Sequence, residues 1–412
     1  MIFRNVFISI IIATAMIISA FIIHQARPKV ELSQPGPEYV RATGKCATCH
    51  LQETSAIVHQ FSMSKHASQN VTCYECHRAQ DKQEEMNHKG FTIAKNLTAL
   101  NCSQCHSTEY SQFLRSRHGA PAWAAVKGDE NFNDEQIAYA EKYHPGSVKR
   151  EANKLAIAEG PGVMEKGCMS CHSVGKPNAD GSIGTCTACH ARHSTSIALA
   201  RQPETCGQCH MGPDHSQLEI YNESKHGVLY SLQKSHFNLD ADPTTLSSKD
   251  MSVPTCATCH MSGLEGMNVT HDVTERLSWW LFAPISNKRP NYNLGQETMK
   301  NTCLKCHAKT HVEKFYNEAE DVVIATNKKV QNALDIINVL RKEGLLTPEP
   351  FDEPIEFIVF DLWHYFGRTA KHGAFMGGAD FVQWHGNYEL LLKTKEIEEI
   401  AERLRERANT KK

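Results

Sequence analysis

The motif Cys-x-x-Cys-His occurs eight times in this chain of 412 residues and uses all sixteen of its cysteines. Two thiols at this spacing can add to the vinyl groups of a porphyrin, and the histidine that follows can bind the iron. Zinc sites or disulfides are the alternative, but a zinc site needs only four ligands and no histidine after every second cysteine. Because histidine makes up 23 of 412 residues, eight such histidines would arise by chance with a probability on the order of 10⁻¹⁰. The motif therefore predicts eight covalently bound c-type haems.

Each motif supplies two attachment cysteines and one proximal histidine. With about one macrocycle per fifty residues and an apolar fraction of 41%, the porphyrins must supply much of the core, so folding depends on haem attachment. The cysteines are Cys46, Cys49, Cys73, Cys76, Cys102, Cys105, Cys168, Cys171, Cys186, Cys189, Cys206, Cys209, Cys256, Cys259, Cys303 and Cys306. The proximal histidines are His50, His77, His106, His172, His190, His210, His260 and His307.

Three histidines outside the motifs share the pattern aromatic-x-x-Ser-basic-His, at residues 61–66, 113–118 and 221–226. We interpret them as distal ligands, which bind an iron from the face opposite its proximal histidine. Two further candidates follow a proximal histidine by three or four residues, so we expect each to leave its motif on a helix and reach a different haem. Seven candidates for eight irons leave one iron short of a ligand. The candidates are His66, His118, His226, His88, His193, His271 and His311.

Residues 1–28 are predicted to target the chain to a membrane. Residues 6–23 carry no charge and follow Arg4. Their length is near the minimum for a spanning helix, and the stretch does not end in the small-x-small site of a cleaved signal peptide. We expect an uncleaved anchor in preference to a cleaved signal, and either places the remaining chain on the periplasmic side of the bacterial cytoplasmic membrane. The formal charge of −2 says nothing about partners, but the sequence has no basic cluster with interleaved aromatics and no helix-turn-helix pattern, so we expect no nucleic-acid binding.

The expected architecture is mostly α, with a haem-packed core of short helices and loops and with long helices at the C-terminus. Helical periodicity predicts helices at 134–159, 313–345 and 380–407, whereas no segment alternates as a strand should. We expect the N-terminal segment 1–28, an octahaem domain over 29–312, and a helical region over 313–412 that serves oligomerisation.

The sequence resembles the octahaem hydroxylamine oxidoreductases from about residue 46 to about residue 395. Four stretches carry the resemblance: RSRHGAPAWAA at 115–125, HMGPDH at 210–215, ESKHG at 223–227 and DFVQWHG at 380–386. Relatives that reduce nitrite usually attach their catalytic haem through Cys-x-x-Cys-Lys, and this chain has no such motif. The resemblance implies a homotrimer whose C-terminal helices reach a neighbouring subunit, and a redox partner such as a membrane cytochrome that oxidises quinol.

The resemblance also implies where catalysis occurs. The family's catalytic haem is the fourth along the chain, which corresponds here to His172 and its two motif cysteines, and one coordination position of its iron is open. An Asp-His pair above that iron corresponds to Asp214 and His215, which could pass protons to a small nitrogen-oxide substrate. From the residues alone, a turn-capping Asp and an ordinary His remain the alternative.

Phe381 departs from the family pattern. Oxidising members carry a tyrosine there that bonds to the catalytic porphyrin of a neighbouring subunit, and phenylalanine cannot make that bond. Tyr388 is seven residues away and is a poor substitute. Because members without the link are generally reductive, we expect reduction of nitrite and/or hydroxylamine to ammonia. The alternatives are oxidation of hydroxylamine to nitric oxide or nitrite, and an electron-transfer cytochrome with no substrate site.

Overall fold

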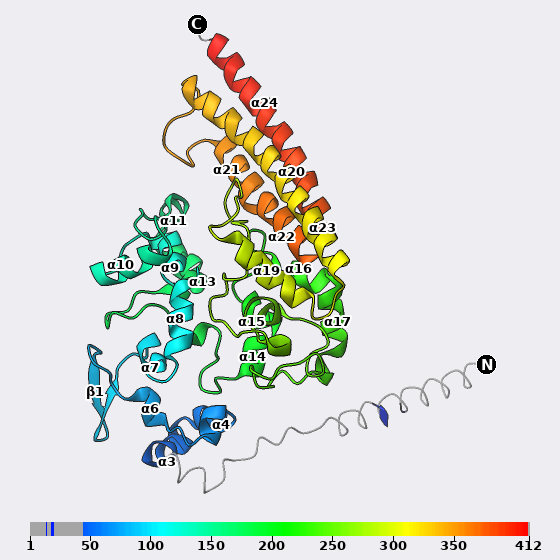
Figure 1. The fold of residues 1–412 in the computed structure, drawn as a ribbon. Coiled ribbons are helices and arrows are strands. Elements are labelled where there is room, and N and C mark those ends of the chain that lie inside the picture. The colour runs from blue at the N-terminus through cyan, green and yellow to red at the C-terminus, as the bar shows by residue number, and fades with distance from the viewer. Residues whose placement is uncertain (1–13, 15–17, 20–43, 411–412) are drawn as a thin grey trace, which may run out of the picture.

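The computed structural model describes residues 14, 18–19 and 44–410 (Figure 1). The predicted membrane segment, residues 1–28, therefore lies outside the described part except for three positions. Among the described helices, none combines the length and apolar character needed to cross a bilayer.

The first half of the described chain consists of short helices joined by loops. Several Cys-x-x-Cys-His motifs form a single helical turn, which places both thiols on one side of the turn. The helices here are α3 (Gly44–Glu53), α4 (Ser55–Ser62), α5 (Lys65–Ser68), α6 (Cys73–His77), α7 (Ala99–Ser103), α8 (Ser107–Arg115), α9 (Ala120–Lys127), α10 (Asp134–Tyr143), α11 (Lys154–Glu159), α12 (Pro161–Lys166) and α13 (Cys168–His172).

Short helices continue as far as the last motif. The α-helices are α14 (Ile197–Arg201), α15 (Pro203–Gly207), α16 (Gln217–Glu223), α17 (Lys225–Gln233), α18 (Cys256–His260) and α19 (Tyr292–Cys303). Four single 3₁₀ turns are η1 (Ser173–Gly175), η2 (Cys186–Ala188), η3 (Lys234–His236) and η4 (Leu264–Gly266).

The C-terminal region is a bundle of longer helices, with α20 and α24 side by side in Figure 1. Its elements are α20 (Lys309–Lys342), α21 (Pro354–Asp361), the π-helix η5 (Leu362–Gly367), α22 (Arg368–Met376), α23 (Ala379–Val382), the π-helix η6 (Gln383–Tyr388) and α24 (Glu389–Thr410). Buried aliphatic side chains from α20, α21, η5 and α24 form one core, which includes Val330, Leu340, Ile355, Leu362, Leu390 and Ile397. The prediction of a mostly helical fold with long C-terminal helices is confirmed.

Three local predictions were wrong. The expected helix 134–159 is split, because Pro145 and Gly146 follow the end of α10 and Pro disfavours a helical residue before it. A hairpin of β1 (Glu85–His88) and β2 (Phe91–Ala94) was missed. All four residues of β1 are exposed, so the strand shows no alternation, and a two-residue turn with positive φ joins it to β2. His193 lies in a turn and not on a helix.

Candidate functional site

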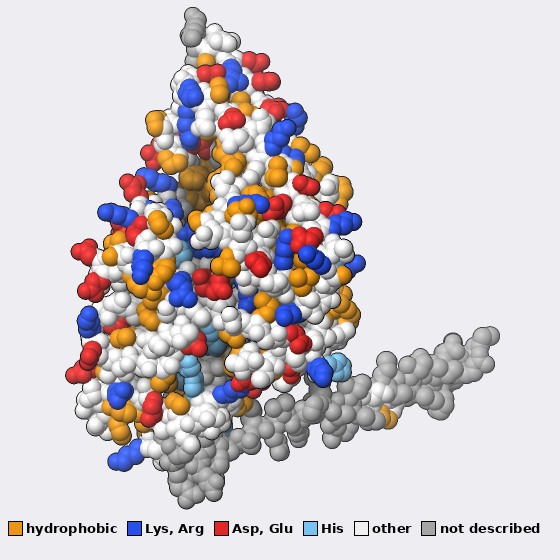
Figure 2. Space-filling view, in the orientation of Figure 1, with side chains coloured by type: hydrophobic (Ala, Val, Ile, Leu, Met, Phe, Trp, Pro, Cys, Tyr) orange, Lys and Arg blue, Asp and Glu red, His pale blue; other side chains and the backbone are white. Residues whose placement is uncertain are grey.

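A continuous cavity of about 3010 Å³ passes through the described chain. Cysteines from six of the eight motifs line this cavity, together with their proximal histidines and with predicted distal histidines such as His66, His118 and His226. Figure 2 shows histidines in the hollow of one face of the molecule. The space thus lies where the thiols and imidazoles predicted to hold the porphyrins converge.

The spacing of the imidazoles tests whether these residues fit haem. Two imidazoles on opposite sides of one iron have ring centres about 6 Å apart, because each metal–nitrogen bond is about 2 Å long. Six proximal histidines face a histidine of another segment with ring centres 5.8–6.5 Å apart. The pairs are His50–His88, His106–His66, His77–His193, His210–His118, His190–His271 and His307–His226. The residues therefore fit haem irons with two axial histidines.

Burial favours the neutral form, which is the form that binds a metal, in four imidazoles of the cavity. It lowers the pKa of His118 to about 3, helped by neighbouring histidines. Burial likewise lowers the pKa of His190, of His210 and of His260 to about 4.

The serine of the aromatic-x-x-Ser-basic-His pattern ends one helix and begins the next element. In each copy the buried serine Oγ donates to the carbonyl oxygen of the aromatic residue three positions earlier, at 2.7–2.8 Å. Ser64 and Ser224 also accept a hydrogen bond from the backbone N–H three residues later, as N-caps of α5 and α17. Ser116 accepts instead from the N–H of His118. The serine therefore fixes the chain direction immediately before each ligand candidate.

Two proximal histidines, His172 and His260, are not among these pairs. His311, the seventh candidate, is exposed on α20 one turn after His307, with ring centres 5.0 Å apart. His260 lies in α18, whose Cys259 is close to the last motif: burial and the neighbouring Cys303 and Cys306 raise the pKa of the Cys259 thiol to about 12.

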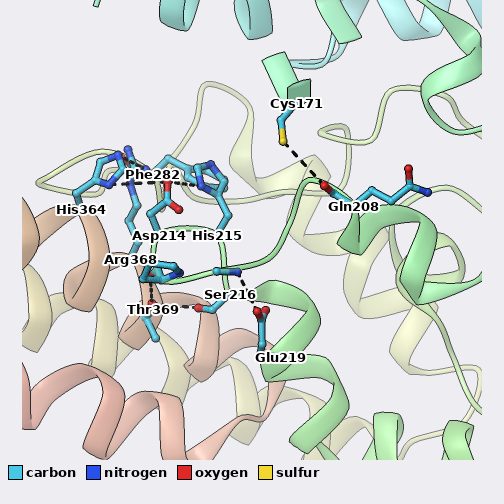
Figure 3. A network of polar contacts seen from close by, with 12 residues as sticks. Cys171, Gln208, Asp214, His215, Ser216, Glu219, Phe282, His364, Arg368 and Thr369 are labelled. Carbon is cyan, nitrogen blue, oxygen red and sulfur yellow. Dashed lines mark hydrogen bonds and ion pairs between the residues drawn. The ribbon is translucent and has the colours of Figure 1, made fainter. Parts of the chain in front are cut away.

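His172 is held in one orientation by the backbone. Its Nδ1 lies 2.6 Å from the carbonyl oxygen of Ala122 in α9, so Nδ1 carries the proton and donates it. Nε2 is then the nitrogen left for a metal. The adjacent Cys171 has its Sγ 3.9 Å from the carbonyl oxygen of Gln208 (Figure 3). Burial lowers the pKa of His172.

Asp214 and His215 form a hydrogen-bonded pair facing the same cavity (Figure 3). His215 Nδ1 lies 2.5 Å from Asp214 Oδ2. Burial alone would raise the pKa of the Asp214 carboxyl, but the hydrogen bond and charge of His215 and the nearby His364 hold it below its ordinary value. The loop is fixed to α22, because Thr369 Oγ1 lies 3.1 Å from Ser216 Oγ and donates to the Pro213 carbonyl.

Three further residues at this pair were not predicted from the sequence. His364 Nδ1 lies 3.9 Å from Asp214 Oδ2. Arg368 is one turn later, with Nη1 2.8 Å from His364 Nε2 and Nε donating to the carbonyl oxygen of Phe282 at 2.9 Å. The Phe282 ring packs against His215, with ring centres 5.3 Å apart. The one available signal was a His and an Arg four residues apart in an aromatic-rich segment.

Phe381 is buried, with 8% of its surface exposed, and its ring stacks on His385 of the same chain at 5.1 Å. Tyr388 is 46% exposed and packs on Trp384. The position at which oxidising hydroxylamine oxidoreductases carry their linking tyrosine is therefore filled here by a ring packed within its own chain.

The cavity, the thiols and the opposed imidazoles define a multihaem c-type cytochrome. The chain belongs to the family described as "Seven times multi-haem cytochrome CxxCH", which matches residues 69–354. Several c-type haems are therefore attached through its Cys-x-x-Cys-His motifs.

Individual relatives are distant. The chain is 25% identical to the "Probable nitrite reductase-hydroxylamine oxidoreductase fusion protein" of Kuenenia stuttgartiensis, over 75% of this chain and 39% of that protein. It thus spans well under half of that curated relative. A solved "Hypothetical multiheme protein" matches with a TM-score of 0.77 and 23% identity, covering 92% of this chain and 98% of the other. A reducing HAO-like protein complex of Kuenenia stuttgartiensis matches with a TM-score of 0.68 and 21% identity, covering 91% and 87%. These two structures share the fold.

Proposed function

We propose that this chain is an octahaem reductase of the hydroxylamine oxidoreductase family that converts nitrite and/or hydroxylamine to ammonia. The observation that carries the proposal is the contrast between His172 and the six paired proximal histidines. Those six face another imidazole, whereas His172 faces none within the described residues, and the hydrogen-bonded Asp214 and His215 lie near enough to act on its pKa. An iron with a single protein ligand can bind a small nitrogen oxide, whereas an iron with two histidines only carries electrons.

The remaining ligand is assigned by elimination. His311 lines the same cavity as His260, and the motif from which it projects adjoins Cys259. We therefore assign His311 to the iron bound by His260, which leaves only the iron of His172 with an open position. This assignment agrees with the expectation that a histidine just after a motif serves a different haem.

At the proposed site, bound haem supplies electrons and an open coordination position for the substrate nitrogen. The chain itself supplies orientation and protons. The Ala122 carbonyl fixes His172 so that Nε2 is available to the metal. Asp214 holds the Nδ1 proton of His215, so His215 Nε2 is the atom that can give up and regain a proton. Each N–O bond that breaks consumes protons, and a carboxylate–imidazole pair is suited to deliver them.

The direction of the reaction is inferred from Phe381. It has no phenolic oxygen, and it packs inside its own chain against His385. Because family members without the porphyrin link are generally reductive, we favour reduction. The likeness to a reducing HAO-like complex and to a nitrite reductase-hydroxylamine oxidoreductase fusion protein supports the same choice.

The test uses purified holoprotein. We expect reduced viologen to drive conversion of nitrite and hydroxylamine to ammonia faster than an oxidised acceptor drives hydroxylamine oxidation. Faster oxidation would reverse the direction and make the chain a hydroxylamine dehydrogenase. No turnover, together with eight six-coordinate haems by spectroscopy, would leave an electron-transfer cytochrome.

The assembly is part of the proposal. Trp384, Tyr388 and Leu391 are about half exposed at the η6–α24 junction, and an exposed apolar patch of this kind suits a contact between subunits. This supports a homotrimer built through the helical region 313–412. We also propose that residues 1–28 anchor the octahaem domain on the periplasmic face of the membrane, where a quinol-oxidising cytochrome supplies electrons.

A further inference from the structure

Arg368 forms no ion pair with an acidic side chain among the residues that the structure describes. It lines the cavity, and its hydrogen bonds go to neutral groups, the Phe282 carbonyl and His364 Nε2. The acidic side chain whose charge reaches it is Asp214, and that carboxylate already binds His215. In Figure 3, Arg368, His364, Asp214 and His215 gather at one place. A guanidinium in a partly buried site has donors left for a further acceptor.

The contact with Arg368 fixes the tautomer of His364. A guanidinium only donates, so His364 Nε2 accepts and the ring proton lies on Nδ1. This Nδ1 is buried and has no hydrogen-bond partner within the described chain. Its distance of 3.9 Å to Asp214 Oδ2 is too long for a hydrogen bond. Buried donors are nearly always satisfied, so this one indicates an acceptor that binds here.

A buried lysine lies behind Arg368. Lys371 is fully buried, and its Nζ donates to Ser286 Oγ at 2.7 Å and to the carbonyl of Ala283 at 3.1 Å. Lys371 and Arg368 thus hold consecutive carbonyls of the loop 282–286, which fixes the Phe282 ring beside His215. The positive charge on this wall of the pocket is therefore that of the Arg368 guanidinium, which lies near the Asp214 carboxylate.

We infer that Arg368 and His364 form an anion-binding site that receives the oxygens of nitrite beside His172, so that the pocket favours an anionic substrate over neutral hydroxylamine. The inference rests on the proposed function and names the substrate class of the same site. The guanidinium supplies charge and donors, and His364 Nδ1–H supplies a second donor. Nitrite gains hydrogen bonds and attraction between opposite charges, whereas neutral hydroxylamine gains hydrogen bonds alone.

The test measures ligand affinity of the oxidised holoprotein from haem spectra, with nitrite as the anion and nitric oxide as a neutral ligand of similar size. Arg368→Gln should weaken nitrite binding at least about tenfold, the loss expected for a hydrogen bond to a charged group. Binding of nitric oxide should change less than about twofold. Arg368→Lys, which keeps the charge, should fall between, and His364→Phe should weaken nitrite selectively. Lys288→Gln, a charge-matched change on the outer surface, is the control.

Unchanged nitrite affinity in Arg368→Gln would overturn the inference, and so would equal weakening of nitrite and nitric oxide, since Arg368 would then only support the loop or the haem. If the wild-type protein still reduces nitrite in that case, the proposed function stands. A wild-type protein that binds nitric oxide but neither binds nitrite nor reduces nitrite or hydroxylamine would overturn both.

Discussion

Replacing Gly227 by alanine should remove the distal ligand from the last haem. Gly227 follows His226 in the first turn of α17, where its N–H donates to the capping Ser224. A methyl group at Gly227 would lie 1.9 Å from the carbonyl oxygen of Tyr221. Because a carbon atom approaches a carbonyl oxygen to about 3.3 Å, relief requires a movement of about 1.4 Å. This displacement is comparable to the length of a metal–imidazole bond, which is about 2 Å. His226 should therefore no longer reach the iron of His307.

The control is Gly119→Ala, at the same place after His118. There the nearest atoms to an added methyl group are carbonyl oxygens at 3.2–3.3 Å, which small adjustments relieve. The third copy of the pattern already has alanine, Ala67, at this place. Electron paramagnetic resonance and visible spectra should show one additional high-spin haem in Gly227→Ala and none in Gly119→Ala. An unchanged spin state in Gly227→Ala, or the same loss in both variants, would refute the steric argument.

Four further predictions concern protons, charge, packing and assembly. His215→Ala should lower the rate of ammonia formation by 10²-fold or more, the contribution typical of general acid–base catalysis, with nitrite affinity nearly unchanged; equal turnover would remove its role in proton transfer. Burial and the nearby Arg368 lower the pKa of Lys371 to about 7. Between about pH 7 and pH 10 the unfolded chain then binds more protons at this lysine than the folded chain does, so thermal stability should rise with pH over that range. The Lys371→Met variant should lack this contribution to the rise. Ile397→Ala should cost about 2–5 kcal/mol in denaturant unfolding, because the side chain is fully buried. Leu391→Asp, at an exposed position, should leave stability within about 0.5 kcal/mol but dissociate the trimer in light scattering; a wild-type monomer would contradict the assembly.

The sequence predicted what depends on local spacing. The motif cysteines and the Ser-basic-His copies are short patterns whose geometry the backbone fixes on its own, and His66, His118 and His226 each face a proximal histidine as such patterns suggest. His88 was also predicted as a ligand and faces His50, but no local pattern marks it, because it lies on a hairpin whose exposed strand shows no periodicity.

The grouping of Asp214, His364 and Arg368 at one site could not be predicted in the same way. Asp214 and His364 are far apart in the sequence, and the packing of α22 against the loop after the sixth motif brings them together. Arg368 follows the predicted end of the octahaem region, within a segment assigned to oligomerisation. Its role depends on the Phe282 carbonyl and on His364, which are tertiary contacts and leave no periodic pattern.

The six histidine pairs have a mechanical consequence. With an iron between the two rings, each pair is a cross-link that closes a loop of the chain. The loop closed by His77 and His193 exceeds a hundred residues. Each closed loop also overlaps the next along the sequence, from His50 through to His307. A cross-link that restrains the unfolded chain stabilises the fold more when its loop is longer. Because these loops overlap, every peptide bond between His50 and His307 lies inside at least one cross-linked loop. We therefore expect this stretch to unfold in a single cooperative transition.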